Sequence, residues 1–240
     1  TLEDDSQYHF EQSVIDTSIY RPTQITYRTG FQITISYTSG TDRVSSIADN
    51  LGRTITFAYD SNGVLTTATV PGGNTVTYAF EYPETGILNS RRLKTVTVSD
   101  GTSSEVTTYH HEDSRFPQLI TGITDARGVR YGTYVYDDAG RVVEEYHPSY
   151  NDHYTFSYAT SSTTVTNALG KSTTYNFSKV AGRTRVTSVD GAASTSCPAS
   201  SSSTSYDSTT GVLTETTDEE GRVTRYVRDS RGLPTSVTRG

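Results

Sequence analysis

Apolar and polar residues alternate along several short stretches of this chain. The clearest stretches are FQITISY (31–37), RTITFAY (53–59) and TVTYAFEY (75–82). Ile, Val, Phe or Tyr recurs at every second residue, and the residues between them are mostly Thr, Ser or Ala. This period of two is typical of β-strands with one half-buried face. Because no stretch shows helical apolar spacing, the pattern predicts a nearly all-β protein.

Turn signals separate these stretches at short intervals. An Asp or Asn stands three residues before a Gly in seven pairs: Asp49 and Gly52, Asp60 and Gly63, Asp125 and Gly128, Asp137 and Gly140, Asn167 and Gly170, Asp218 and Gly221, Asp229 and Gly232. Asp first and Gly fourth is a type I turn preference, in which the side chain accepts backbone N–H bonds and Gly takes a positive φ. The turns therefore predict β-hairpins closed by a bulge.

The spacing of the turns is nearly constant. Gly52 and Gly63 are 11 residues apart, and Gly128 and Gly140 are 12 apart. Two turns differ from the others: the KVAG turn before Gly182 lacks the acid, and the turn from Asp207 to Gly211 has an extra residue. A fixed period indicates a repeat architecture. A β-sandwich, with turns every 8–12 residues, is the alternative from spacing alone.

Three longer stretches share a similar sequence pattern. They are YDSNGVLTTATVPGGNTVTYAFEY (59–82), DARGVRYGTYVYDDAGRVVEEY (125–146) and DEEGRVTRYVRDSRGLPTSVT (218–238). They resemble the YD repeats of the Rhs family of bacterial polymorphic toxins, in which Tyr-Asp-x-x-Gly-Arg-Leu is followed by an Asp-x-x-Gly half. The resemblance is strongest over residues 24–82, 119–147 and 203–238.

This resemblance implies an all-β fold in which antiparallel hairpins form a curved or spiral sheet, part of a hollow shell. In the family the shell encloses a C-terminal toxin domain, and related repeats occur in toxin-complex BC components and in teneurins. The implied partners are the rest of the chain's own shell, the enclosed toxin domain and a secretion apparatus, at a secreted or cell-surface location in bacteria. The alternative is a cell-surface carbohydrate-binding or adhesive module, in which exposed aromatic residues would cluster.

The whole chain, 1–240, is expected to be one continuous repeat array, because neighbouring units share a sheet and no linker separates cores. Its expected parts are irregular leading strands (1–50), YD-like repeats (51–147), degenerate Ser/Thr-rich repeats (148–204) and regular repeats (205–238). Cutting such an array leaves open strand edges, which we expect near residues 24–37 and 222–238. Open edges recruit other strands, so self-association is expected, chiefly through the first edge.

The repeat positions are interpreted as structural. Tyr59, Tyr136 and Tyr206 end a strand just before a turn Asp, so each ring is expected to lie over a neighbouring backbone with its hydroxyl at the rim. The arginines that follow a turn Gly are Arg53, Arg141, Arg183 and Arg222. We expect them to stack on tyrosines or to pair with turn acids of the adjacent unit. A ligand-binding role for the tyrosines, such as stacking on sugars, is the alternative.

Charge and composition exclude several other classes. The formal net charge of −7 disfavours non-specific binding to nucleic acid or to acidic membranes. No apolar run approaches the roughly 18 residues of a membrane span. The single cysteine, Cys197, has no partner for an intramolecular disulfide.

No group of residues predicts catalysis, a metal or a cofactor. In YHHEDSRF (109–116), His110 and His111 are adjacent, and neighbours in a strand point to opposite faces, so they are not expected to share a metal with Glu112 or Asp113. A solvated loop is the expected structure there.

The other candidates for chemistry also lack partners. HPSYNDH brings together His147, Asp152 and His153, but no nucleophile stands in a recognisable setting nearby. Cys197 lies in a Ser-rich stretch that does not mark an activated thiol. We therefore expect the chain not to be an enzyme.

Overall fold

The computed structural model describes residues 5–83, 90–150, 152–193, 195, 198–229 and 231–240. The chain divides into two compact units, Thr1–Val129 (unit 1) and Arg130–Gly240 (unit 2), and each is described by itself. Cys197 lies outside the described residues.

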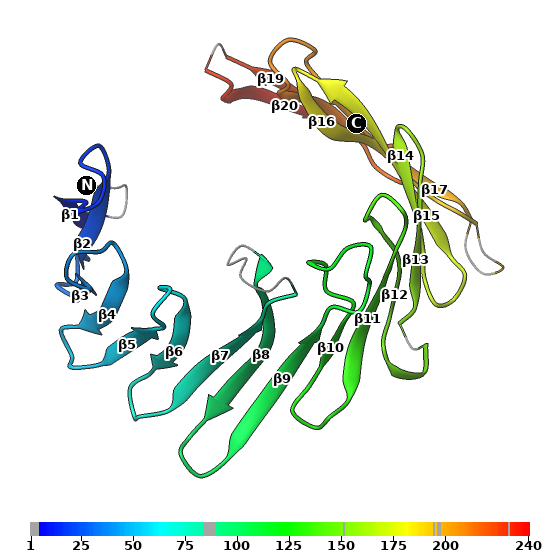
Figure 1. Cartoon of the computed structure of the whole chain (residues 1–240). Helices are drawn as coiled ribbons and strands as arrows, with labels where there is room; N and C mark the ends of the chain where they lie inside the picture. The colour runs from blue at the N-terminus through cyan, green and yellow to red at the C-terminus, as the bar shows by residue number, and fades with distance from the viewer. Residues whose placement is uncertain (1–4, 84–89, 151, 194, 196–197, 230) are drawn as a thin grey trace. The chain divides into compact units, whose positions relative to one another are not determined.

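Unit 1 consists of strands and turns (Figure 1). Its strands are β1 (Gln7–Gln12), β2 (Tyr20–Thr26), β3 (Gln32–Tyr37), β4 (Val44–Asp49), β5 (Thr54–Tyr59), β6 (Leu65–Thr69), β7 (Thr75–Glu81), β8 (Arg92–Ser99), β9 (Ser104–His110) and β10 (Gly122–Thr124). Each strand pairs antiparallel with the next one along the chain, from β1 to β10.

Unit 2 is built in the same way. Its elements are β11 (Arg130–Tyr136), β12 (Val142–Tyr146), the 3-10 turn η2 (Pro148–Tyr150), β13 (Tyr154–Tyr158), β14 (Ser162–Thr166), β15 (Ser172–Val180), β16 (Arg183–Gly191), β17 (Ser200–Tyr206), β18 (Leu213–Thr217), β19 (Val223–Arg228) and β20 (Pro234–Arg239). Successive strands again pair antiparallel, from β11 to β20. The predicted all-β fold of antiparallel hairpins is confirmed.

The pairing register gives the sheet of unit 1 two chemically different faces. On one face, hydroxyl side chains stand opposite each other from strand to strand, in the row Ser36, Ser46, Thr56, Thr69, Thr75, Ser99 and Ser104. On the other face Ile35, Ile47 and Ile55 form a row of β-branched side chains. The period-two sequence pattern therefore corresponds to cross-strand rows of like residues, which stabilise a sheet through lateral contacts.

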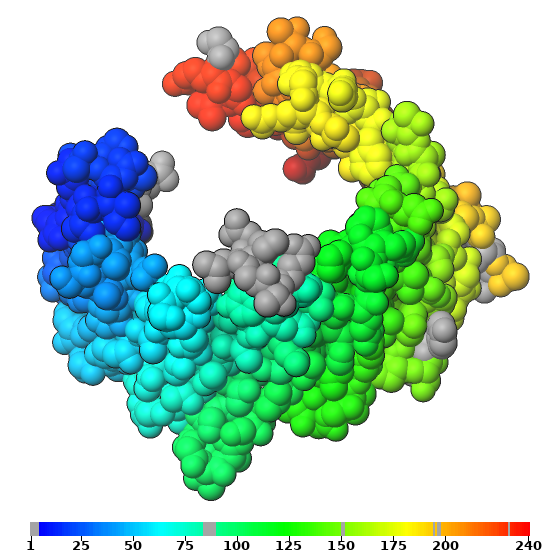
Figure 2. All heavy atoms as spheres, viewed as in Figure 1, coloured from blue at the N-terminus to red at the C-terminus, as the bar shows by residue number. Residues whose placement is uncertain are grey.

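The described part of the sheet buries few apolar side chains. Among the described residues, the only buried apolar side chains are Val64 and Ala68, at 5% and 7% exposure. In the space-filling view the hairpins of unit 1 follow one another as adjacent bands (Figure 2). Stability must then come from main-chain ladders, cross-strand rows and contacts at the strand ends.

One expected strand edge is wrong. Residues 24–37 were expected to be open, but β2 pairs with both β1 and β3, and β3 pairs with both β2 and β4. The short stretch QYHFEQ forms β1 and covers β2, because Tyr8 and Phe10 already alternate with polar residues there. The expectation of one array across 1–240 concerns how the units join, and it stays a prediction.

Candidate functional site

The Asp137 turn shows how a repeat closes its hairpin. The N–H of Gly140 donates to the carbonyl of Asp137 at 3.0 Å, and the N–H of Asp137 donates to the carbonyl of Arg141 at 2.9 Å. The Asp137 carboxylate accepts the N–H groups of Ala139 and Arg141, both at 2.9 Å. Gly140 has φ of 73°, a conformation that costs a side-chain-bearing residue energy.

The same geometry recurs at every Asp-x-x-Gly or Asn-x-x-Gly turn predicted from sequence. The first residue of each turn accepts, through one side-chain oxygen, the N–H groups two and four residues later. These first residues are Asp49, Asp60, Asp125, Asp137, Asn167, Asp218 and Asp229. The turn glycines Gly52, Gly63, Gly128, Gly140, Gly170, Gly221 and Gly232 have φ between 73° and 85°.

The two irregular turns also close their hairpins, but with different backbone geometry. In the turn at Asp207 the extra residue makes Gly211 donate to the carbonyl four residues back, at 2.8 Å. The turn without an acid pairs Val180 directly with Arg183, so only Ala181 and Gly182 connect β15 and β16. Both have positive φ, 48° and 77°, which is the backbone of a tight two-residue hairpin.

The arginines after the turn glycines pair with their own turn. Arg53 donates to Asp49 at 2.6 Å, Arg141 to Asp137 at 2.8 Å and Arg222 to Asp218 at 2.7 Å. Stacking on a tyrosine, the first expectation, holds for Arg141, which lies 4.5 Å from the centre of the Tyr158 ring. The alternative, pairing with an acid of the adjacent unit, is wrong for these three. The reason is local: the positive φ of the glycine folds the chain back, so that the following side chain lies beside the carboxylate four residues earlier.

Two further arginines take this role where the residue after the glycine is apolar. Arg127 donates to Asp125 at 2.8 Å, and Arg231 donates to Asp229 at 2.9 Å. They stand at the third turn position, so an Asp-x-Arg pattern was the sequence signal that the prediction missed.

These contacts lower the pKa of most turn carboxyl groups. For Asp49, Asp137 and Asp229 the main cause is the backbone N–H group four residues later. For Asp125 and Asp218 the hydrogen bond from the turn arginine contributes most to the lowered pKa. The carboxylates are therefore held in the ionised form in which they accept several hydrogen bonds.

Tyrosines fasten neighbouring hairpins at one edge of each unit, which we call the tyrosine edge. Tyr59 ends β5, and its hydroxyl donates to the Val44 carbonyl at the start of β4, at 2.7 Å. The β4–β5 ladder stops two residues short of Val44, at the pair of Ser46 and Thr56. The hydroxyl therefore reaches a carbonyl beyond the end of the ladder, which would otherwise need water.

Three more tyrosines make the same bond. Tyr37 donates to Pro22 at 2.7 Å, Tyr158 to Val142 at 2.6 Å and Tyr206 to Val186 at 3.2 Å. Tyr136 also ends a strand, β11, and its side chain is half-buried. The register shifts one residue before Tyr37, Tyr59, Tyr136 and Tyr206. That bulge re-aims the side chain at the end of the strand.

An arginine precedes each of these acceptor residues. Arg21, Arg141 and Arg185 lie over the rings of Tyr37, Tyr158 and Tyr206, at 4.2, 4.5 and 5.0 Å from the ring centres. The fourth, Arg43, fills the space above the Gly63 turn, where an added Cβ would lie 1.9 Å from the guanidinium. The sequence prediction missed Arg21, Arg43 and Arg185, although each stands directly before the Pro or Val that follows a turn.

We call each place where a strand-end side chain bonds the hairpin before it a junction. At one junction, arginine replaces the strand-end tyrosine. Arg228 ends β19 where other repeats have tyrosine, and its Nε donates to the Leu213 carbonyl at 3.1 Å. Its Nη1 donates to the Gly232 carbonyl at 3.0 Å. The residue before Leu213 is Val212, where other junctions have arginine. At this junction the arginine therefore stands at the strand end and is itself the donor to the carbonyl.

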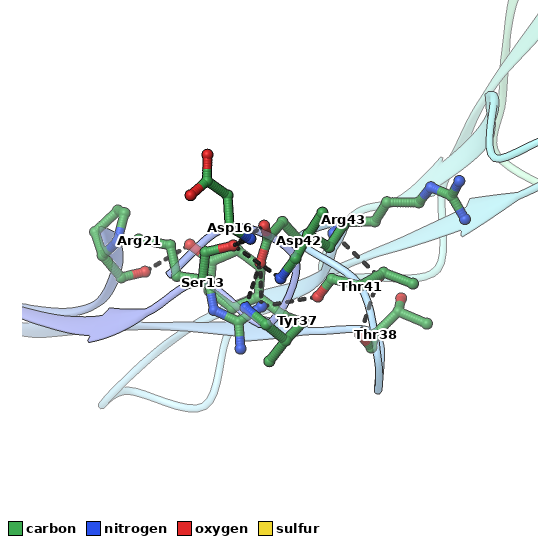
Figure 3. Close-up of polar contacts among 11 residues, drawn as sticks. Ser13, Asp16, Arg21, Tyr37, Thr38, Thr41, Asp42 and Arg43 are labelled. Carbon is green, nitrogen blue, oxygen red and sulfur yellow. Dashed lines mark hydrogen bonds and ion pairs between the residues drawn. The ribbon is translucent and has the colours of Figure 1, made fainter. Parts of the chain in front are cut away.

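The first hairpin of unit 1 is attached through a polar cluster around Asp42 (Figure 3). Ser13 donates to the Asp42 carboxylate and accepts the N–H groups of Ile15 and Asp16, each at 3.0 Å. Arg21 donates to the same carboxylate at 2.8 Å. The bond from Ser13 is the main cause of the lowered pKa of Asp42, and burial raises the pKa of Tyr37 nearby.

The histidines do not form a shared centre. His110 contacts the Thr124 hydroxyl at 2.7 Å, whereas His111 contacts two main-chain carbonyls. His147 lies 3.6 Å from Asp152, and His153 lies 2.7 Å from Glu144. Over the part of the chain that the structure describes, no three His, Cys, Asp or Glu side chains gather as a metal site. In that same part, no helix has the length and apolar character needed to cross a membrane.

Comparison with known proteins finds one matching repeat and a similar fold. Residues 37–75, which contain both Tyr59 and its acceptor Val44, match the RHS Repeat family model. No curated protein sequence matches the chain. In the crystal structure of TcdB2-TccC3 without its hypervariable C-terminal region, the similar part has a TM-score of 0.53 at 14% identity, covering 91% of this chain and 16% of that one.

A second solved structure is more distant. It is the Tc holotoxin pore of Photorhabdus luminescens, with a TM-score of 0.38, 14% identity, and coverage of 91% of this chain and 17% of that chain. This chain thus spans about a sixth of the TcdB2-TccC3 chain, and the likeness to that crystal structure concerns the fold. Residues 37–75 thus match an RHS repeat, and the fold of the chain is similar to that of a part of TcdB2-TccC3.

Proposed function

We propose that this chain is a wall segment of a YD-repeat shell that encloses another polypeptide, the C-terminal toxin domain of a secreted Rhs-type protein. The observation that carries the proposal is the tyrosine edge, where side chains of one hairpin bond the main chain of the hairpin before it. Such bonds build a wall by repetition, without a core beneath it.

Two further observations support a wall. Few of the described apolar side chains are buried, so a hairpin depends on its neighbours along the sheet. The fold resembles that of TcdB2-TccC3, a protein with a hypervariable C-terminal region that the crystal structure lacks. By this proposal the chain's role is structural and non-catalytic, its partners are the rest of its shell and the enclosed domain, and it acts outside the cell that makes it.

Protease protection tests the proposal. The polypeptide that contains residues 1–240 would be purified with the domain that follows them and treated with a protease. Release of that domain's fragments is measured against time, in the unchanged protein and in a Tyr59→Ala, Tyr158→Ala double variant that opens two junctions. We expect protection in the unchanged protein and faster digestion in the variant. Equal, rapid digestion in both would contradict the shell.

An adhesive or sugar-binding module is the second candidate, because one hairpin exposes aromatic rings. Tyr8, Phe10 and Tyr20 are 43%, 50% and 62% exposed, and the rings of Tyr8 and Phe10 stack at 6.3 Å. A glycan array probed with the chain and with Tyr20→Ala separates the two functions. Saturable binding that the substitution removes would favour the module.

A further inference from the structure

The loop between β9 and β10, residues 111–121, is tied to the start of β8 by side chains that bond main-chain carbonyls. Arg92 donates to the Pro117 carbonyl, and Gln118 donates to the Ser90 carbonyl at 2.9 Å. His111 makes the third tie. Its Nδ1 lies 3.1 Å from the Leu119 carbonyl, and its Nε2 lies 3.0 Å from the Leu93 carbonyl.

The two partners of His111 define the protonation state in which both contacts are bonds. A carbonyl oxygen only accepts hydrogen bonds, so each ring nitrogen must carry a hydrogen to bond its partner. Neutral imidazole has one N–H and one lone pair, whereas imidazolium has two N–H groups. In the neutral ring one of the two contacts therefore becomes a lone pair facing a carbonyl oxygen.

We propose that His111 is a proton-operated clasp, closed when the imidazolium bonds β8 and the loop together, and half-open when the ring is neutral. Among the three ties, Arg92 and Gln118 keep their donors at all pH values near neutrality, so only the His111 tie responds to protons there. The attachment of the loop to β8 is then strongest in mild acid. It weakens as the pH rises through the range in which histidine titrates, between about pH 5 and 8.

The charged groups around the clasp come from three elements. Arg92 of β8 lines the same cavity of about 390 Å³ as His111, and it is paired with Glu81 of β7 at 2.6 Å. Within the loop, Glu112 and Asp113 line this cavity too, and Asp113 is paired with Arg115 at 2.8 Å. From β9, His110 lies 3.7 Å from Glu112.

Hydrogen exchange of the loop tests the clasp. Amide exchange of residues 111–121 would be measured at pH 5.5 and 7.5 and corrected for intrinsic exchange rates. For the unchanged chain we expect about tenfold greater protection at pH 5.5, the effect of one charged hydrogen bond. In His111→Gln, which cannot titrate, the corrected protection should be the same at both pH values.

The control addresses the neighbouring histidine. His110→Gln should keep the pH-dependent protection, because the Thr124 hydroxyl that His110 contacts can either donate or accept. If His110→Gln removes the pH dependence and His111→Gln keeps it, or if the unchanged chain shows none, the clasp is overturned.

A second measurement needs no substitution, and it decides the matter if His111→Gln misfolds. Nitrogen NMR of the His111 ring reports whether one or both ring nitrogens are protonated. We expect two N–H groups at pH 5.5, with one lost at the same midpoint at which the loop amides lose protection. A ring that is already neutral at pH 5.5, or midpoints that differ, would contradict the proposal.

Discussion

Two hairpin junctions, one in each unit, make the same side-chain bond to a main-chain carbonyl, but one uses tyrosine as the donor and the other uses arginine. In unit 1 the hydroxyl of Tyr59 donates to the Val44 carbonyl, and Arg43 before that acceptor lies against the next turn. In unit 2 the guanidinium of Arg228 donates to the Leu213 carbonyl, and Val212 stands before the acceptor. Both junctions need a donor side chain that is long enough to reach the carbonyl beyond the end of the hydrogen-bonded ladder.

The difference also shows why arginine and tyrosine are paired at most junctions. Where the donor is tyrosine, an arginine covers its ring in three of the four cases. Where the donor is Arg228, a second arginine at residue 212 would bring two like charges together, and valine avoids this. The two positions therefore depend on each other, and they can be tested together.

The largest expected effect is at the tyrosine junction. Tyr59→Ala removes a half-buried ring and the donor to Val44, and we expect the free energy of unfolding of unit 1 to fall by about 2 kcal/mol. Tyr59→Phe keeps the ring and should cost about 1 kcal/mol, through the unpaired carbonyl alone. Urea unfolding followed by circular dichroism measures both. Equal costs for the two variants would show that the hydroxyl bond carries the whole effect.

The turn glycines sharpen the comparison, because Arg43 covers only one of them. Gly63 and Gly232 have φ of 76° and 82°, so alanine at either should cost about 1 kcal/mol from backbone strain. A Cβ at Gly63 would also meet the Arg43 guanidinium, whereas a Cβ at Gly232 would have no described atom within 4 Å apart from its chain neighbours. Gly63→Ala should therefore be the more damaging by urea midpoint, and Arg43→Ala should remove the excess. An excess that survives Arg43→Ala would mean that the arginine does not cover the turn.

A double-mutant cycle tests whether the exchange at the second junction is a unit. Arg228→Tyr should cost about 1 kcal/mol, since it loses the bond to the Gly232 carbonyl. Val212→Arg alone should also destabilise, by placing two cations together. Combined, they recreate the common arrangement, so we expect a favourable coupling of about 1 kcal/mol. Additive costs in the four unfolding curves would show that the positions are independent.

The sequence predicts what is local in this molecule. Period two locates strands, and Asp-x-x-Gly locates turns, because both depend on residues within one strand or one loop. The acceptor of Tyr59 lies 15 residues earlier, at Val44, and depends on where the neighbouring ladder ends. The two acceptors of His111 are main-chain carbonyls 18 residues before it and 8 after it, so residue type gives no signal for them. A solvated loop was expected over residues 109–116. A loop does follow from residue 111, but Tyr109 and His110 belong to β9, and His111 within the loop is half-buried.

The smallest expected effect concerns two turns whose first residues are an aspartate, Asp137, and an asparagine, Asn167. Asp137 and Asn167 cap their turns through the same two N–H bonds, but only Asp137 has a second, charged oxygen for an arginine. Its pKa is lowered, chiefly by the N–H of Arg141, so this carboxylate stabilises the fold above its ordinary pKa of about 3.9. That stabilisation is lost as the pH falls through the lowered value.

Asp137→Asn keeps the cap and removes the titration. We expect the variant to unfold at slightly lower urea than the unchanged chain at pH 6, and the gap to narrow as the pH falls below about 4. Asn167→Asp is the reverse control: it adds a carboxylate near Lys171, so a gap in its favour should open at pH 6 and close in acid. A gap for Asp137→Asn that stays constant from pH 6 to pH 3 would mean that the amide and the carboxylate differ only in shape. The charge on the turn would then contribute nothing to holding the hairpin.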